Sequence, residues 1–255
     1  MIQIARYLTI DLLKNKAIIG SFLLFVAIGW GLFFIENQPE KALLMVMQVT
    51  LLLLPLITLI FSCIYYYNSY EFTVLLLSNP IKRNAVIQAF FIALSLSFSI
   101  AYTLGIGLPL LINYPTAETL ILLLSGNFLL WIFVGLALFI STKVNDKVKG
   151  IGLVLILWAF FAFLFDGLLI MIMYQFGAYP IEKLILVLTF LNPIDISRIS
   201  VIMQTDASAM MGLSGAVFVD FFGSVRGLMI SFTALLIWVA LMYIGAVRNF
   251  GKSDL

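Results

Sequence analysis

The sequence predicts an all-α polytopic membrane protein with six transmembrane helices. Hydrophobic residues make up 64% of the 255 residues, and only 10% of the residues are charged. A soluble protein carries about 25% charged residues, so this chain has too little polar surface to cover a soluble fold. The net charge of +2 also gives no basic surface for nucleic-acid binding. Six charge-poor stretches are long enough to cross a bilayer.

The spans are placed by these stretches, because about 20 apolar residues cross the hydrocarbon core. The predicted spans cover residues 17–35, 43–64, 85–112, 119–141, 150–173 and 227–247 of one transmembrane domain, residues 1–255. Before the first span, Ile4, Leu8 and Leu12 share one helical face with Arg6 roughly opposite. This pattern predicts an N-terminal interfacial helix.

The cations indicate the orientation. If the N-terminus is inside, only Lys41, Lys183, Arg198 and Arg226 of the 14 Lys and Arg residues fall on outer segments. Cytoplasmic loops of membrane proteins carry the excess of Lys and Arg. Both termini are therefore predicted to lie in the cytoplasm.

The outer segment between spans 5 and 6, residues 174–226, is the longest connection. Its apolar stretch Leu184–Ile194 is too short to cross, so we expect a re-entrant or interfacial helix there. Asp195 and Arg198 are three residues apart and can pair on a helix.

Asp166 is the one acid predicted inside a span, where insertion costs about 2.5–3.5 kcal/mol. It is either a functional group, or a structural acid that hydrogen-bonds at a helix interface or lies near the outer end of the span. Met171 and Met173 follow it, and thioethers suit Cu(I), although Met also fills gaps in apolar helices. These three residues are candidates for an intramembrane pathway, and an ion-coupled secondary transporter that uses Asp166 is one functional hypothesis. These residues are too few to predict a metal site.

Several kinds of chemistry are excluded by composition. The chain has no histidine, which removes His-dependent catalysis and HExxH zinc sites, and its one cysteine cannot form an intrachain disulfide. Gly251-Lys252-Ser253 lacks the earlier glycine of a P-loop, because that position is Ala246. The chain is predicted to be no enzyme and to bind no cofactor itself.

The inner segment between spans 2 and 3 predicts a short helix, Tyr66–Ser78, because Pro80 cannot continue it. An ordinary interfacial loop with cationic anchors is the alternative. The segment resembles the signature of ABC-2 type transporter permeases, with Phe72 where that family usually has Gly. The residues that carry the resemblance are Glu71, Thr73, Leu75-Leu76-Leu77-Ser78, Pro80 and Arg83.

This resemblance implies that the inner segment is a coupling helix that docks on an ABC ATPase subunit through Glu71, Thr73, Leu76, Ser78, Pro80 and Arg83. It also implies a homodimer in the bacterial inner (cytoplasmic) membrane. ATP and Mg would bind to the separate ATPase. An exporter of another substrate is the closest alternative.

The outer segment is similar to the permeases of the nitrous oxide reductase maturation system in two stretches, Leu191–Arg198 and Met211–Phe218. This similarity implies a role in copper-site assembly, by transfer of copper or a sulfur species or by mechanical coupling to a periplasmic β-helical protein. We also expect Phe221 and Phe222 to be exposed, as interface aromatics often are. The residues predicted to dock the periplasmic partner are Asn192, Pro193, Asp195, Arg198, Gly215, Phe218 and Asp220.

Overall fold

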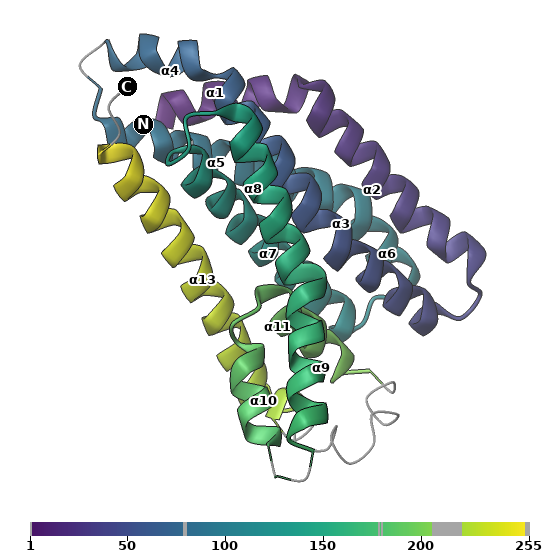
Figure 1. The fold of residues 1–255 in the computed structure, drawn as a ribbon. Helices are drawn as coiled ribbons and strands as arrows, with labels where there is room; N and C mark the ends of the chain where they lie inside the picture. The colour runs from purple at the N-terminus through teal and green to yellow at the C-terminus, as the bar shows by residue number, and fades with distance from the viewer. Residues whose placement is uncertain (1, 79–80, 178, 180, 206–220, 253–255) are drawn as a thin grey trace.

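The computed structural model describes residues 2–78, 81–177, 179, 181–205 and 221–252. Every regular element in these residues is a helix (Figure 1). The elements are α1 (Ile2–Lys14), α2 (Lys16–Ile35), α3 (Pro39–Asn68), α4 (Tyr70–Leu77), α5 (Arg83–Tyr102), the π-helix η1 (Thr103–Gly107), α6 (Leu108–Asn113), α7 (Ala117–Ser141), α8 (Lys147–Ala159), the π-helix η2 (Phe160–Leu164), α9 (Phe165–Gln175), α10 (Glu182–Thr189), α11 (Pro193–Ile202) and α13 (Val225–Lys252).

Six of the described helical segments are long and apolar enough to cross a membrane, which confirms the predicted number of spans. Each predicted span lies within one of them, and the helices extend a few residues beyond the apolar stretches. Their bounds are Lys16–Ile35, Pro39–Asn68, Arg83–Asn113, Ala117–Ser141, Lys147–Gln175 and Val225–Gly251. The third and fifth segments each contain a π-helical turn.

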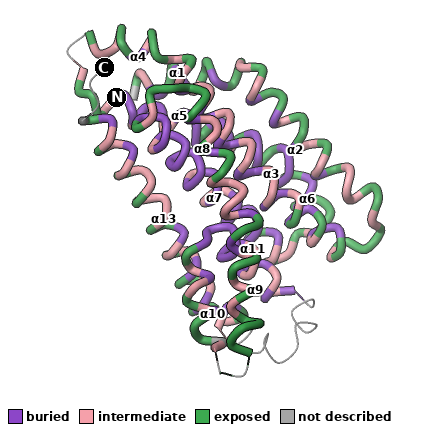
Figure 2. The backbone as a smooth tube through the Cα atoms, viewed as in Figure 1, coloured by how far each residue is buried: buried purple, intermediate pink, exposed green. Residues whose placement is uncertain are grey.

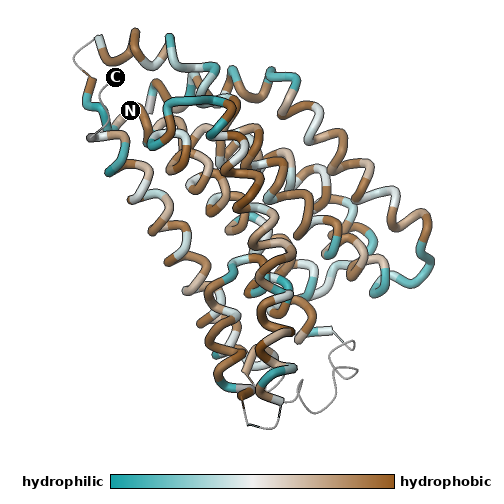
Figure 3. The backbone as a smooth tube through the Cα atoms, in the orientation of Figure 1, coloured by the Kyte–Doolittle hydropathy of each residue, from teal (hydrophilic) through white to brown (hydrophobic). Residues whose placement is uncertain are grey.

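The core of the bundle is formed by α3, α5 and α7, and more than half of the most apolar stretch of each of these spans is buried (Figure 2). The helices α2, α8–α9 and α13 pack around them and expose one side. Along the spans most residues are hydrophobic, and the hydrophilic residues gather toward the helix ends (Figure 3). Many of the large side chains exposed along the spans are apolar, such as Leu23, Ile156 and Leu236. An apolar exposed surface between two polar ends is what a bilayer requires.

The two ends of the bundle differ. One end carries α1, α4 and the last turn of α13, and we call it the terminal end (Figure 1). The opposite end carries α10 and the close of α9, and we call it the distal end. Both described chain ends lie at the terminal end, as an even number of spans requires.

Two predicted helices have different boundaries in the structure. The helix expected over Tyr66–Ser78 is shorter in the structure and covers Tyr70–Leu77. Helix α3 continues to Asn68, and Ser69 is the one residue that separates the two helices. The stretch expected to be one helix over Leu184–Ile194 is divided between α10 and α11, which meet at 117°. Pro193 disfavours helical backbone at the preceding residue, and Asn192 caps α11 by accepting from the backbone N–H of Ile194 at 3.0 Å.

Candidate functional site

Helix α4 lies across the terminal end and has two unlike faces (Figure 1). Thr73 is buried, and Phe72, Leu76 and Leu77 pack against the core of the bundle. The outward face carries large apolar side chains, with Tyr70 52% exposed and Leu75 66% exposed. An apolar helix face outside the spans is a candidate protein contact.

Contacts of α4 and α1 tie the terminal end together. The ring of Phe72 stacks on that of Tyr7 in α1, with centroids 6.1 Å apart. The Tyr65 hydroxyl in α3 donates to the Asp11 carboxylate in α1 at 2.9 Å. The residue that departs from the ABC-2 pattern, Phe72, therefore joins α4 to the N-terminal helix.

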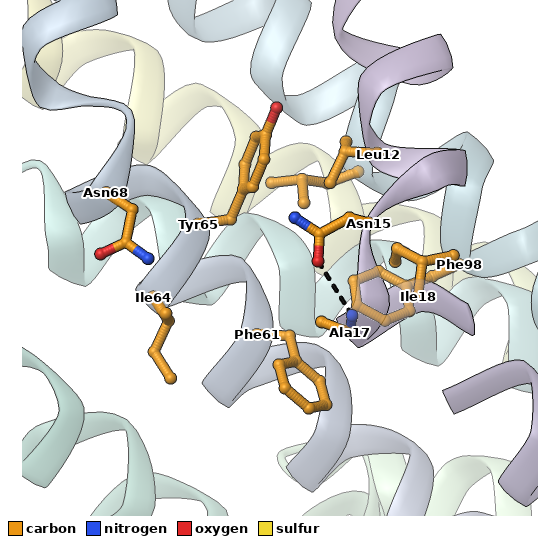
Figure 4. A pocket seen from close by; sticks show the side chains of 10 residues that line it. Leu12, Asn15, Ala17, Ile18, Phe61, Ile64, Tyr65, Asn68 and Phe98 are labelled. Carbon is orange, nitrogen blue, oxygen red and sulfur yellow. Dashed lines mark hydrogen bonds between the residues drawn. The ribbon is translucent and has the colours of Figure 1, made fainter. Parts of the chain in front are cut away.

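A small cavity of about 80 Å³ lies where α1 turns into α2 (Figure 4). Asn15 ends the turn by accepting a hydrogen bond from the backbone N–H of Ala17 at 2.9 Å. On the far side of the cavity, Tyr65 and Asn68 belong to the last turn of α3. The Asn68 amide oxygen accepts from the Lys147 ammonium at 2.8 Å, which links this corner to the start of α8.

Asp146 precedes α8 at the same end. Its carboxylate accepts from the backbone N–H of Lys149 at 3.0 Å and so caps the helix. This hydrogen bond lowers the pKa of the Asp146 carboxyl, because it favours the charged form.

A charge cluster lies farther along the bundle, toward the distal end. The NH1 nitrogen of Arg198 in α11 donates to the Asp166 carboxylate at 2.6 Å and to the Asp195 carboxylate at 3.1 Å. The Asp195 side chain is 4% exposed and the Arg198 side chain 23% exposed. The cluster joins span 5 to the bent α10–α11 pair, and the predicted Asp195–Arg198 pairing is confirmed.

Asn192 completes the cluster. Its side-chain amide donates to the Asp195 carboxylate at 2.9 Å and to the Phe161 carbonyl at 2.8 Å. Phe161 belongs to η2, the π-helical turn of span 5. A π-helical turn leaves carbonyls without their α-helical partners and often marks a functional position. Here the Phe161 carbonyl of the turn accepts from a side chain of another helix.

No protein-family model matches the chain. A protein of Pseudomonas aeruginosa named "Probable ABC transporter permease protein NosY" is 29% identical over 232 residues, which cover 82% of this chain and 84% of the relative. A protein of Stutzerimonas stutzeri with the same name is 26% identical over 218 residues, covering 77% of this chain and 79% of the relative. The comparisons support a NosY-like permease. The resemblance that the sequence predicted is thereby confirmed over about four fifths of the chain.

In this NosY-like chain the predicted coupling residues do not all face the same way. Glu71 is exposed on α4, Ser78 is exposed directly after the helix, and Arg83 is exposed at the start of α5. Thr73 is buried and Leu76 half-buried, so their contribution would be to hold α4 in place. Pro80 lies outside the described residues, and the coupling role stays a prediction.

The predicted docking residues fall in two groups. Asn192, Pro193 and Asp195 are buried, and Arg198 is engaged in the charge cluster. These four residues hold α11 against the bundle and expose little surface to a partner. Gly215, Phe218 and Asp220 lie outside the described residues. The expectation that Phe222 is exposed is wrong, because its ring is fully buried and stacks on Phe190 with centroids 5.8 Å apart.

Met171 and Met173, the other pathway candidates, are 68% and 40% exposed on α9. Among the residues that the structure describes, no group of three or more His, Cys, Asp or Glu side chains is arranged to hold a metal ion. The contact between Asp166 and Arg198 was not predicted from the sequence. The two residues lie 32 positions apart, and no local sequence pattern indicates that they meet.

Proposed function

We propose that the chain is the permease subunit of an ABC transporter and works as a homodimer with a separate ATPase. The observation that carries this proposal is α4, which exposes Tyr70, Glu71, Val74 and Leu75 at the end of the bundle that holds both termini. The names of the two relatives support the same class of protein. The chain itself acts as a transporter subunit and not as an enzyme.

The contacts of α4 suggest how ATP binding would move the spans. An ATPase bound to the outward face of α4 would push on α4. Only one residue, Ser69, separates α4 from α3, so the displacement would reach α3 directly. The Tyr7–Phe72 stack would pass the same displacement to α1, and from there to α2. Closure of the ATPase on ATP would therefore tilt spans 1 and 2 together.

The proposed biological role is nitrous oxide reductase copper-site maturation in the bacterial inner membrane, with both termini cytoplasmic. The partners would be a NosF-like ATPase at the terminal end and a NosD-like β-helical protein at the distal end, where span 5 closes and α10 lies. Copper, a sulfur species or mechanical force on the periplasmic partner would be what the permease delivers.

Leu75→Asp is expected to abolish co-purification of the ATPase, because it places a charge in the centre of the apolar α4 face. Central interface residues of this kind contribute about 2 kcal/mol or more to binding, so the affinity should fall by at least about 30-fold. Glu71→Lys should weaken the complex as well. The measurement is pull-down of the ATPase from detergent-solubilised membranes, with the amount of inserted permease determined in parallel.

Leu75→Met is the matched control, since it keeps an apolar side chain of similar size and should retain the ATPase. Full ATPase capture by the Leu75→Asp protein would show that α4 is not the docking element. ATP hydrolysis by the purified permease alone would show that no separate ATPase is needed.

A further inference from the structure

A groove of about 340 Å³ lies between α2 and α3, near the terminal end. Its wall is apolar and includes Leu24, Ile57 and Phe61. It is also lined by a cation, Lys16, which is the first residue of α2. Lys16 is exposed, and it forms no ion pair with any residue that the structure describes. We call this cavity the α2–α3 groove.

The 80 Å³ cavity at the turn from α1 to α2 adjoins the groove, because Ala17 and Phe61 line both. Asn15 and Asn68 lie on opposite sides of this cavity with their amide nitrogens turned toward it (Figure 4). Both amide oxygens already accept, from the backbone N–H of Ala17 and from the Lys147 ammonium. Neither amide nitrogen has an acceptor within the described residues. Asn15 is half-buried and Asn68 exposed, so a ligand can reach both donors.

The charges around the two cavities favour an anion. Lys14 and Lys16 are exposed at the turn, and Lys147 is exposed on the other side, where it contacts Asn68. The acids beside them are Asp11 and Asp146, and both accept hydrogen bonds within the chain. Excess positive charge at a membrane surface attracts anionic lipids, and amide N–H groups donate to phosphate oxygens as well.

The length of the groove matches one leaflet. Leu24 lies eight residues beyond Lys16 along α2. At about 1.5 Å per residue this is about 12 Å, close to half of a hydrocarbon core of about 30 Å. The donors of Asn15 and Asn68 lie at the helix ends, where headgroups are found. Gly20 keeps the groove open, since a Cβ there would meet nothing within 4 Å.

A second copy of the chain fits the groove less well. It would have to bring an acid to the terminal end to meet Lys16. Among the described acids at that end, Asp11 and Asp146 already accept hydrogen bonds within the chain. The third, Glu71, lies on α4, which is the proposed contact with the ATPase. A phospholipid supplies the anion and the apolar chain together.

We propose that the α2–α3 groove binds one anionic phospholipid from the leaflet at the terminal end. The phosphate would accept from the amide nitrogens of Asn15 and Asn68 beside Lys16, and an acyl chain would lie along Leu24, Ile57 and Phe61. The site does not depend on the proposed function, since it requires neither an ATPase nor a periplasmic partner.

The test compares phosphatidylglycerol with phosphatidylcholine of the same acyl chains, because both carry a phosphate and only the first has a net charge. The full-length permease is titrated with each lipid in detergent, and bound lipids are counted by native mass spectrometry. We expect one tightly bound phosphatidylglycerol per chain, preferred at least about fivefold, as about 1 kcal/mol for one lysine predicts. Excess glycerol 3-phosphate, which has no acyl chain, should not displace it.

Two substitutions test the headgroup contacts. Lys16→Gln should lower the preference for phosphatidylglycerol about fivefold. Lys143→Gln, at another exposed cation of the terminal end that lines neither cavity, is the matched control and should keep the preference. Asn68→Asp keeps an acceptor for Lys147 but replaces the amide donor by a carboxylate, so it should also weaken binding of the anionic lipid.

Gly20→Leu tests the groove itself, because a leucine there should fill it and release the lipid. Gly31→Leu is the control on the same helix, since a Cβ at Gly31 also meets nothing within 4 Å and Gly31 does not line the groove. Equal binding of the two lipids by the wild-type protein, displacement by glycerol 3-phosphate, or full lipid binding by the Gly20→Leu protein would overturn the proposal. A helix of the partner subunit in the groove of a solved homodimer would overturn it as well.

Discussion

Arg198→Met is expected to lower the free energy of unfolding by about 3 kcal/mol or more, because it leaves two carboxylates without their cation. Asp195 is almost fully buried and cannot recover its hydration by a small movement. Met fills much of the same volume, so the loss would report the missing charge rather than a cavity. The measurement is the unfolding equilibrium of the protein in bicelles.

The charge explanation has a rescue experiment. Adding Asp195→Asn to Arg198→Met removes the more buried carboxylate and keeps the polar contact with Asn192, so more than half of the lost stability should return. Asp166→Asn in the otherwise unchanged protein should leave insertion and assembly intact, because Asp195 still pairs with Arg198. A cluster without structural importance would give less than about 0.5 kcal/mol for Arg198→Met, as for a surface substitution.

Gly29→Ala is expected to cost about 1–3 kcal/mol, because it forces extra volume into a close helix contact. A Cβ at Gly29 would lie 2.7 Å from the carbonyl oxygen of Gly105 and 3.2 Å from the Cα of Ile106. These atoms belong to the backbone of η1, so α2 and η1 would have to separate. The free energy of unfolding in bicelles measures the cost.

Gly31→Ala provides the control on the same helix. A Cβ there meets nothing within 4 Å, and alanine has a higher helix propensity than glycine by about 1 kcal/mol. The control should therefore be neutral or slightly stabilising. Equal effects of the two substitutions would show that the close approach of α2 to η1 does not limit packing.

The spans were predictable because a membrane imposes a local requirement. Each needs about 20 apolar residues in a row, and such runs can be counted in the sequence. The buried face of α1 was predictable for a similar reason, since Leu8 and Leu12 recur at helical spacing and both are buried. The Asp195–Arg198 pair also follows from spacing along one helix.

The distal cluster was only partly predictable. Asp166 was recognised as unusual, but its partner depends on the 117° bend that folds α11 back against span 5. That bend combines a local signal, the Asn192-Pro193 pair, with packing of α11 on other helices, which no local pattern reveals. The outward face of α4 was missed for the same reason, because burial of Thr73 decides that Leu75 and not Leu76 points away from the bundle.

The most direct test of the account is disulfide cross-linking between α4 and the co-purified ATPase. The background is Cys63→Ala, which removes the one native cysteine. Leu75→Cys, on the outward face, should form a cross-link to the ATPase that tightens or shifts when ATP is added. Thr73→Cys, two residues away on the buried face, should form none. Cross-linking from neither position in a complex that still contains the ATPase would contradict the claim that force enters the permease through α4.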